Sequence, residues 1–508
     1  MTETQPALPD AVSGREPAAM SVRGAAVWAM AGQYLAFAIQ FVASVVISRY
    51  FLGPGEVGLF SIGMATALIV AVLQDFGLSR YISGLSVLDH AEISRCGSVA
   101  LLFSLVIAAI IAATAWPMAG AYHEPRLAAI LLILASSYLF VPLSVVPMAL
   151  MARAMQFRGH FAVNVCAALA QGGVAVALAA AGYSSFALAW ATVAAAAVRG
   201  IVAQAMRPSW PRRLQLNGIG QVVGFGARAS VLYLTGALGT RTPDLIVGKM
   251  LGVTAVGLYS RAVSLSDQFR MLIAGAIGSV FFPAFARIRD RGEPMAPAYL
   301  RVVAGYSGVV WPGMAGLALA SEPIIRLLYG PAWLRTAPLL AMIAVTEVML
   351  IALPLVSDLP ILAGKLNQLL ARNLVDTVMS VVLLAVGTHW GVAGAAASRL
   401  VYAVFWFALY FRFMQRIVGF RVGSLLLIYL RSGLASLAAI APLALTYALW
   451  VPPEVMTFAQ LLLATGAGMG CWLVALVVLR HPVLGEMLGV AAAIPLVHRC
   501  MPARFRPA

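Results

Sequence analysis

The sequence predicts an all-α polytopic membrane protein with about 14 transmembrane helices, arranged as two parallel six-helix repeats and two further helices. Hydrophobic residues make up 62% of the 508 residues, charged residues 10%, and the mean hydropathy is +0.93. This composition is too apolar for a water-soluble protein of this length. The chain also contains a repeat, because Leu52–Ser61 (LGPGEVGLFS) returns as Leu251–Ser260 (LGVTAVGLYS) with six identical positions in ten. Two such copies suggest a transporter built from parallel repeats.

The expected spans follow from runs of about 20 apolar residues, the number that crosses the hydrocarbon core of a bilayer. In the first half these runs cover residues 25–50, 57–74, 98–117, 127–150, 162–181 and 184–203. The second half gives 226–249, 254–280, 302–321, 337–363, 370–388 and 391–411, followed by 424–449 and 457–479. Six spans separate the two copies of the repeat, so both copies enter the membrane in the same orientation.

These spans divide the chain into segments. They are a tail (1–24), an N-lobe (25–214, helices 1–6), a C-lobe (215–421, helices 7–12), helices 13–14 (422–480) and a C-terminal tail (481–508). Lys and Arg accumulate in cytoplasmic loops. With the N-terminus inside, most of the 34 basic residues are cytoplasmic, and the far side holds Arg49, Arg126, Lys249, Arg326 and Arg335. We therefore expect both termini in the cytoplasm and a polar N-terminal tail rather than a signal peptide.

Composition and motifs exclude several classes of protein. The net charge of +16 is spread over many short loops, which favours contact with membrane lipids over nucleic acid. The four cysteines form no CxxC pair and the six histidines show no metal-ligand spacing, so we expect no metal and no cofactor. No GxxxxGK[ST], GxSxG or HExxH motif occurs. Since the far-side loops are short, an enzyme would have to work within the helices.

Charged residues inside the spans are concentrated in the second half. Charge at bilayer depth costs at least about 2.5 kcal/mol per residue, so these side chains should face an interior cavity. The candidates are Arg241, Asp244, Arg261, Asp267, Arg270, Glu347 and Arg399. The first half offers amides and hydroxyls instead, with Gln33 and Gln40 seven residues apart on one helical face and Ser44 next along the stripe.

The most concentrated signal is Gly239–Asp244 (GTRTPD), which lies inside an apolar span. Pro243 should kink the helix and free carbonyl groups. Arg241 and Asp244 are three residues apart and can pair. One interpretation is a self-neutralising pair in a packed core, and the other is an anionic head-group site, because a guanidinium offers a fork of donors to phosphate.

Glu347 lies about ten residues into its helix, which places it near the bilayer midplane. A carboxylate at that depth is either paired or protonated. Coupling to protons or sodium ions is therefore one interpretation, and a static interhelical ion pair is the other. Asp267 and Arg270 are also three residues apart, and a structural pair is favoured for them. For Arg261 and Arg399, cavity lining and structural pairing are equally open.

Several segments together resemble a known family. Arg49–Ser61 (RYFLGPGEVGLFS) and Gln74–Ser79 (QDFGLS) are similar to the opening helices of bacterial polysaccharide flippases of the multidrug/oligosaccharidyl-lipid/polysaccharide exporter superfamily. The likeness continues through MARAMQFR (151–158), DLIVGKMLGVTAVGLYS (244–260), FPAFAR (282–287) and EPIIRLLYGPAWLRTAP (322–338). These motifs are mainly glycine turns and helix ends, so they specify the fold better than the substrate.

The resemblance implies two six-helix lobes around a central cavity that opens to either side of the bacterial inner membrane in turn. It implies undecaprenyl-diphosphate-linked oligosaccharide as the substrate, for O-antigen, capsule or exopolysaccharide synthesis. Polysaccharide polymerase and chain-length or export proteins are the implied partners. A cationic second lobe suits the diphosphate, with Arg241, Arg261 and Arg399 expected to contact it and Gln33 and Gln40 to face the sugars.

Two alternatives remain open at this stage. A cation-coupled multidrug extruder of the same superfamily would share the fold, although it should favour acidic cavity groups. A membrane enzyme acting on a polyprenyl-linked sugar would need an acid/base pair reachable from one face.

Overall fold

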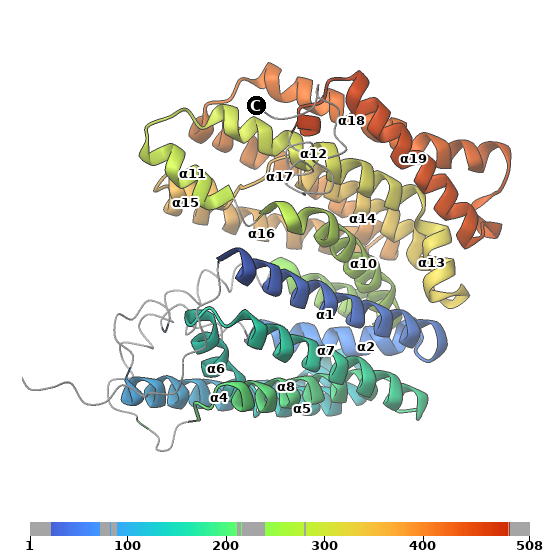
Figure 1. Cartoon of the computed structure of the whole chain (residues 1–508). Coiled ribbons are helices and arrows are strands. Elements are labelled where there is room, and N and C mark those ends of the chain that lie inside the picture. The colour runs from blue at the N-terminus through green and yellow to red at the C-terminus, as the bar shows by residue number, and fades with distance from the viewer. Residues whose placement is uncertain are drawn as a thin grey trace, which may run out of the picture.

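The computed structural model describes residues 22–71, 82, 89–210, 215, 239–278, 281–485 and 487. These residues form helices joined by short turns, and the described ranges contain no strand. Figure 1 shows two groups of helices, with α1, α2 and α4–α8 in the lower group and α10–α19 in the upper. The predicted all-α fold is confirmed.

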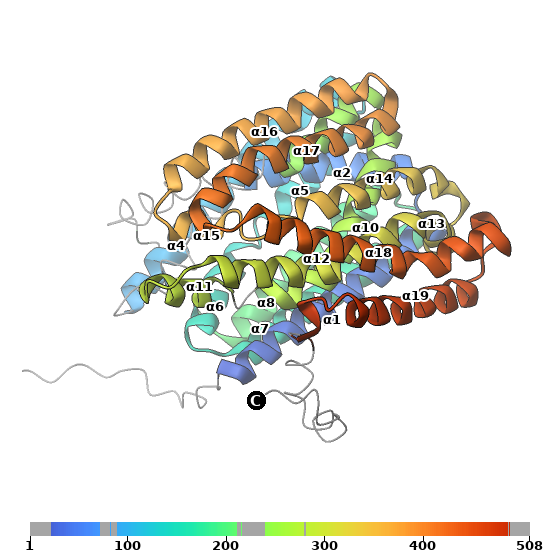
Figure 2. The same cartoon turned by 90° about the horizontal axis from the view of Figure 1, so that it is seen from above.

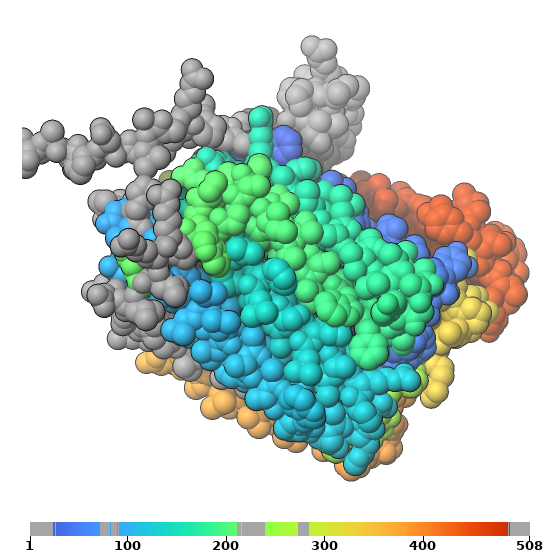
Figure 3. All heavy atoms as spheres, turned by 90° about the horizontal axis from the view of Figure 1, so that it is seen from below, coloured from blue at the N-terminus to red at the C-terminus, as the bar shows by residue number. Residues whose placement is uncertain are grey.

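The first group takes up the first half of the chain. Its helices are α1 (Val22–Tyr50), α2 (Pro54–Ala71), α4 (His90–Tyr122), α5 (Arg126–Ser137), α6 (Pro142–Arg153), α7 (Phe157–Ala180) and α8 (Phe186–Met206). Even α2, with 18 residues, extends about 27 Å, close to the thickness of the hydrocarbon core. Seen from below, in Figure 3, this group presents a continuous packed face coloured blue to green.

The second group follows a helical stretch at residues 239–251. It begins with α10 (Val253–Gly278), α11 (Phe281–Asp290), α12 (Ala296–Leu319), α13 (Ser321–Tyr329), the 3-10 helix η2 (Pro331–Thr336), α14 (Ala337–Leu350) and α15 (Asp358–Leu362). It continues with α16 (Leu366–Thr388), α17 (Gly391–Val418), α18 (Val422–Leu449), η3 (Pro453–Val455) and α19 (Phe458–Val478). Figure 2 shows the long helices of this group running side by side.

The chain is a multi-pass membrane protein. Eleven of the described helices are long and apolar enough to cross a membrane, or twelve if the bent pair α5–α6 is one span. The 26 residues of α10 are also long enough, but this helix carries Arg261, Asp267 and Arg270. The predicted span 226–249 begins outside the described residues. These findings are consistent with the predicted count of about 14 spans without fixing it.

Two predicted spans are broken at prolines. The span predicted at 127–150 consists of α5 and α6, which are bent by 45° relative to each other. Pro142 begins α6 and has no N–H group to continue the hydrogen bonding of α5. The span predicted at 337–363 ends as a regular helix at Leu350, and Pro354 follows in the turns before α15. Tyr429 of α18 donates a hydrogen bond of 2.6 Å to the Ala352 carbonyl in this break.

The two groups meet along α2 and α10, and the duplicated segment makes this contact. A Cβ atom added at Gly58 would lie 1.8 Å from the Val253 carbonyl oxygen, and one at Gly257 would lie 1.8 Å from the Pro54 carbonyl oxygen. Only glycine permits such a backbone approach. Because 58 and 257 are equivalent positions of the repeat, as are 54 and 253, the contact is symmetric. The Ser61 and Ser260 hydroxyls, again equivalent, lie 3.1 Å apart.

Further hydrogen bonds join the groups at one end of the molecule. We call this the outer end, because the sequence predicts it on the far side of the membrane. Tyr122 of α4 donates to the Leu245 carbonyl at 2.8 Å, and Trp333 of η2 donates to the Ser48 carbonyl at 2.9 Å. The Arg49 side chain reaches the Leu327 carbonyl of α13. The segment between the predicted spans 302–321 and 337–363 is therefore helical and lies against the end of α1. The largest apolar core runs through the same region and contains residues of both groups.

Candidate functional site

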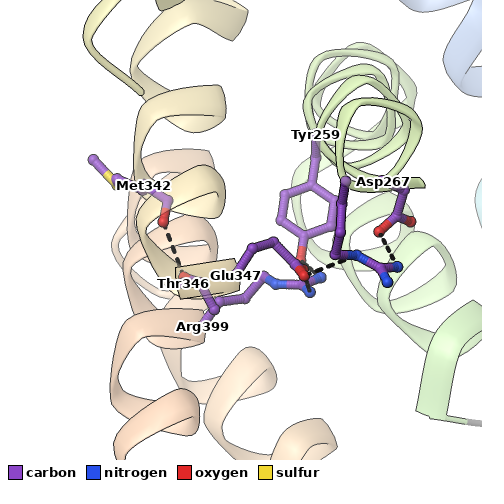
Figure 4. Close-up of polar contacts among 7 residues, drawn as sticks. Tyr259, Asp267, Met342, Thr346, Glu347 and Arg399 are labelled. Atoms are coloured by element: carbon purple, nitrogen blue, oxygen red, sulfur yellow. Dashed lines mark hydrogen bonds and ion pairs between the residues drawn. The ribbon is translucent and has the colours of Figure 1, made fainter. Parts of the chain in front are cut away.

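Three helices of the second group bring charged side chains together. Asp267 and Arg270 come from α10, Glu347 from α14 and Arg399 from α17. Figure 4 shows the Glu347 carboxylate between the α10 residues and Arg399, beside the ring of Tyr259. We call these five residues the charged cluster.

The cluster is centred on Glu347. Its Oε2 lies 3.1 Å from Arg270 Nε and its Oε1 lies 3.7 Å from Arg399 Nη2. Arg270 Nη2 also lies 3.2 Å from Asp267 Oδ1, so these two residues form the ion pair that their spacing allows. Tyr259 Oη accepts a hydrogen bond of 3.5 Å from Arg399 Nη1. The formal charges of the four ionisable groups cancel.

The side chains of the charged cluster differ in their exposure to solvent. The Glu347 side chain is 7% exposed, whereas those of Arg399, Arg270 and Asp267 are 22%, 40% and 51% exposed. Although Arg270 Nε lies close to Glu347, its N–H is not directed at a carboxylate oxygen, and Arg399 Nε likewise has no hydrogen-bond partner among the described residues. Both side chains remain partly exposed, so an anion that enters from the exposed side can approach the two guanidinium groups.

Arg261 lies elsewhere and has different contacts. It is nine residues from Arg270 on α10, which places the two side chains on opposite faces of the helix. Arg261 donates to the Ser44 and Ser48 hydroxyls of α1, the latter at 2.7 Å. Its guanidinium carbon is 5.1 Å from the ring centres of both Tyr329 and Trp333. These contacts join α1 to α10, α13 and η2 at the outer end.

Arg241 and Asp244 do not close the predicted ion pair. No salt bridge within 4.0 Å joins them, although Asp244 is attracted electrostatically to both Arg241 and Arg399. Asp244 is partly buried and Arg241 is exposed. The structure thus places this pair next to the charged cluster and outside its direct contacts.

Gln33 and Gln40 lie on α1 and are both exposed, as a polar stripe requires. The Gln40 amide donates to Gln171 Oε1 of α7 at 3.2 Å. They belong to the first group of helices, whereas the charged cluster belongs to the second.

Sequence reasoning missed Tyr259, Ser48, Tyr329 and Trp333. One signal for Tyr259 was present, because it replaces Phe60 at the equivalent position of the repeat. The same offset of the two copies relates Ile62 to Arg261, and it relates Leu68 and Ala71 of α2 to Asp267 and Arg270 of α10. The second copy therefore carries polar groups where the first copy is apolar.

Comparison with known proteins identifies relatives of this chain. Residues 46–338 match the family model described as polysaccharide biosynthesis protein. The succinoglycan biosynthesis transport protein ExoT of Rhizobium meliloti is 25% identical over 392 residues, covering 75% of this chain and 76% of that protein. The lipopolysaccharide biosynthesis protein WzxC of Escherichia coli is 20% identical over 325 residues, covering 63% and 65%.

Solved structures share the fold. The lipid II flippase MurJ, in an inward closed conformation, superposes with a TM-score of 0.74 at 13% identity, covering 90% of this chain and 100% of that structure. A multidrug resistance transporter of the MATE family in an inward-facing conformation gives a TM-score of 0.59 at 15% identity, covering 77% and 98%. The resemblance inferred from sequence motifs is thus confirmed. Since the family match extends over more than half of its length, the chain belongs to the family of polysaccharide biosynthesis proteins.

Proposed function

We propose that the protein is a flippase that moves a polyprenyl-diphosphate-linked oligosaccharide, with undecaprenyl as the lipid, across the bacterial inner membrane. The oligosaccharide serves O-antigen, capsule or exopolysaccharide synthesis. Both termini lie in the cytoplasm. The protein is a transporter rather than an enzyme, and it delivers its cargo to a polysaccharide polymerase with its chain-length or export proteins. Family membership and the names of its relatives support this assignment.

The observation that carries the proposal is the charged cluster on a single lobe. Hydrocarbon rejects the diphosphate more strongly than any other part of the cargo, so a flippase must offer it cations. Arg270 and Arg399 provide two partly exposed guanidinium groups, and guanidinium binds phosphate oxygens in a bidentate manner. Arg241 extends this cationic surface on the exposed side. The amides Gln33 and Gln40 on the facing lobe are suited to sugar hydroxyls.

Glu347 gives the site a way to release its ligand. In the empty site its carboxylate neutralises Arg270 and Arg399. An arriving diphosphate competes for the same two cations and displaces the carboxylate, which can then take up a proton. We propose that Glu347, with Asp267 and Arg270, couples transport to protons, and sodium is the alternative ion.

The transport cycle that we propose is alternating access. The N-lobe (25–214) and the C-lobe (215–421) are held together at the outer end by the α2–α10 contact and by Arg261. In this state the cargo binds from the cytoplasm. Release outside requires that this contact separates, so Arg261 acts in closure of the outer end in our proposal.

The test is reconstitution into liposomes that carry a short lipid-diphosphate oligosaccharide on one leaflet, with exposure to an added glycosidase as the readout. The native protein should expose the sugar, and Arg399→Ala should slow exposure at least tenfold, because a charge-assisted hydrogen bond contributes about 1.5–3 kcal/mol. Arg241→Ala should have a smaller effect, since Arg241 is exposed. Failure of the native protein to move the lipid, in vesicles that extrude a cationic dye, would favour the multidrug extruder.

A second prediction concerns Tyr259 and uses its counterpart as a control. Tyr259→Phe removes the hydroxyl that accepts from Arg399 and leaves the buried ring in place. We expect the apparent KM for the lipid substrate to rise about threefold with little change in maximal rate, because one long hydrogen bond contributes about 0.5–1 kcal/mol. Phe60→Tyr makes the reverse exchange in the first copy and should not alter KM. Equal KM values for the native protein and Tyr259→Phe would remove Tyr259 from the site.

A further inference from the structure

A proline interrupts the hydrogen bonding of α12 and leaves a gap in the helix, which we call the notch. Pro312 lies inside this helix and has no N–H group, so the carbonyl of Gly308, four residues earlier, has no partner in its own helix. Gly308 also lacks a side chain, which leaves room beside this carbonyl. A Cβ atom at Gly308 would lie 2.7 Å from the His481 ring, so the space is already in use.

Residues of α19 and the segment after it fill the notch. Trp472 of α19 donates from Nε1 to the free Gly308 carbonyl at 3.0 Å. His481 follows the end of α19 and is 2% exposed. Val483 packs with Ala435 and Leu476 in an apolar cluster that borders the same place.

The hydrogen bonds of His481 run in one direction. The backbone N–H of Val483 donates to Nδ1 at 3.2 Å, so Nδ1 is the acceptor and Nε2 carries the proton. Nε2 then donates to the Ser432 hydroxyl of α18 at 2.9 Å, and Ser432 donates to Ser307 of α12 at 2.8 Å. Ser307 donates to the Val303 carbonyl at 2.7 Å, and this is the last hydrogen bond of the series. Each donor in this chain has an acceptor, and this holds only for a neutral imidazole.

We infer that Trp472 and His481 form a lock that fixes α19 and residues 481–483 to α12 and α18 in the second group of helices. The inference is independent of the cargo, because it uses no residue of the charged cluster. It gives residues 481–483 a structural role in holding α19.

The lock should open in acid. A second proton on His481 would sit on Nδ1 and meet the Val483 N–H, so two donors would face each other. α19 has no charged side chain, α12 has Arg301 and α18 has Arg431, and Arg431 is the cation that acts on His481. Burial, with Arg431 second, lowers the pKa of His481 from 6.5 to about 4. Since the folded-state pKa is below the unfolded one, the stabilisation is complete above pH 6.5 and is lost progressively as the pH falls toward 4.

Amide hydrogen exchange of residues 481–485 in lipid nanodiscs tests the lock. Ser432→Ala breaks the chain from His481, and Trp472→Phe removes the donor to Gly308. Each should lower the protection factors of these amides about tenfold at pH 7. Ser436→Ala is the matched control, because Ser436 is a buried serine one turn along α18 whose hydroxyl bonds its own helix. It should leave protection unchanged.

Measuring amide protection as a function of pH distinguishes opening of the lock from loss of overall stability. Native protection at 481–485, corrected for intrinsic exchange, should fall on the order of 100-fold between pH 7 and pH 4. His481→Gln keeps a donor for Ser432 but cannot titrate, so its profile should be flat. Amides of α7 report whether the whole protein remains folded. Equal protection in Ser432→Ala, Trp472→Phe and Ser436→Ala, or a native profile as flat as that of His481→Gln, would overturn the inference.

Discussion

A disulfide between α2 and α10, formed by Ser61→Cys with Ser260→Cys, is expected to stop lipid transport completely and reversibly. The two hydroxyl oxygens lie 3.1 Å apart, so the replacement thiols can be joined with little movement of the backbone. The experiment needs a background in which Cys96, Cys166, Cys471 and Cys500 are replaced by alanine. Oxidation should reduce sugar exposure to the level of empty liposomes, and reduction should restore it.

The expected effect is large because this contact joins the two lobes backbone to backbone. Gly58 and Gly257 let the backbones of α2 and α10 touch, and no side chain separates them. A covalent bond one turn away keeps the outer end closed. If transport requires alternating access, a closed outer end prevents release of the cargo while binding from the cytoplasm continues.

A matched disulfide within the second group of helices provides the control. The hydroxyls of Ser307 and Ser432 lie 2.8 Å apart, and both residues belong to the second group of helices. Ser307→Cys with Ser432→Cys should form a disulfide as readily and should leave transport near the level of the cysteine-free background. Transport by the oxidised Ser61–Ser260 variant would show that the outer end does not need to part at this contact.

The repeat was visible in the sequence, but its structural consequence was not. Six identities in ten positions predict two equivalent segments, and the glycines and serines among them are conspicuous. That the two copies pack against each other depends on how the lobes meet, which requires long-range packing information. The glycine at each crossing is explained only when the carbonyl of Pro54 or Val253 is found opposite it.

Helix breaks were missed for a similar reason. Apolar runs predicted single spans at 127–150 and 337–363, because hydropathy does not register the loss of one backbone donor. Proline inside a membrane helix is tolerated when another group satisfies the freed carbonyl. The partner for the Gly308 carbonyl is Trp472, more than 160 residues away, which no local pattern can indicate.

The charged cluster was predictable only in part. Counting residues predicted Glu347 near the middle of a span at 337–363, but the regular helix ends at Leu350, three residues later. The contact between Asp267 and Arg270 follows from helix geometry. The partner of Glu347 depends on how α10, α14 and α17 pack together. Arg261 shows most clearly that a position on a helix does not identify the contacts of a side chain. It lies on the same helix as Arg270 but contacts serines and aromatic rings on the opposite face.

Glu347→Gln is expected to tighten substrate binding and slow turnover at the same time. Loss of the carboxylate removes the internal competitor for Arg270 and Arg399, so the apparent KM for the lipid diphosphate should fall about tenfold, equivalent to about 1.4 kcal/mol. When the diphosphate leaves the variant, no carboxylate replaces its oxygens at Arg270 and Arg399. Release of the cargo is therefore slower, and the maximal rate should fall more than tenfold. Sugar exposure in liposomes over a range of lipid concentrations measures both quantities.

Stability must be measured with transport, because two arginines lose their main counterion. Breaking a fully buried ion pair destabilises a protein by about 3–5 kcal/mol. The loss of stability in Glu347→Gln should be smaller, since Arg270 and Arg399 remain 40% and 22% exposed. Glu322→Gln is the control, because it removes the carboxylate paired with Arg326 on α13, outside the charged cluster. A partly exposed pair contributes about 0.2–1 kcal/mol to stability, and KM and the maximal rate should both be retained.

The split between KM and maximal rate decides between the two interpretations of Glu347. A static ion pair predicts a lower melting temperature for Glu347→Gln with KM unchanged. A carboxylate that exchanges with the cargo predicts higher affinity and lower turnover in the variant. It also predicts that a pH gradient imposed across the liposome membrane changes the transport rate of the native protein but not that of Glu347→Gln. If KM rises instead, Glu347 contributes to binding directly, and the competition between carboxylate and diphosphate must be abandoned.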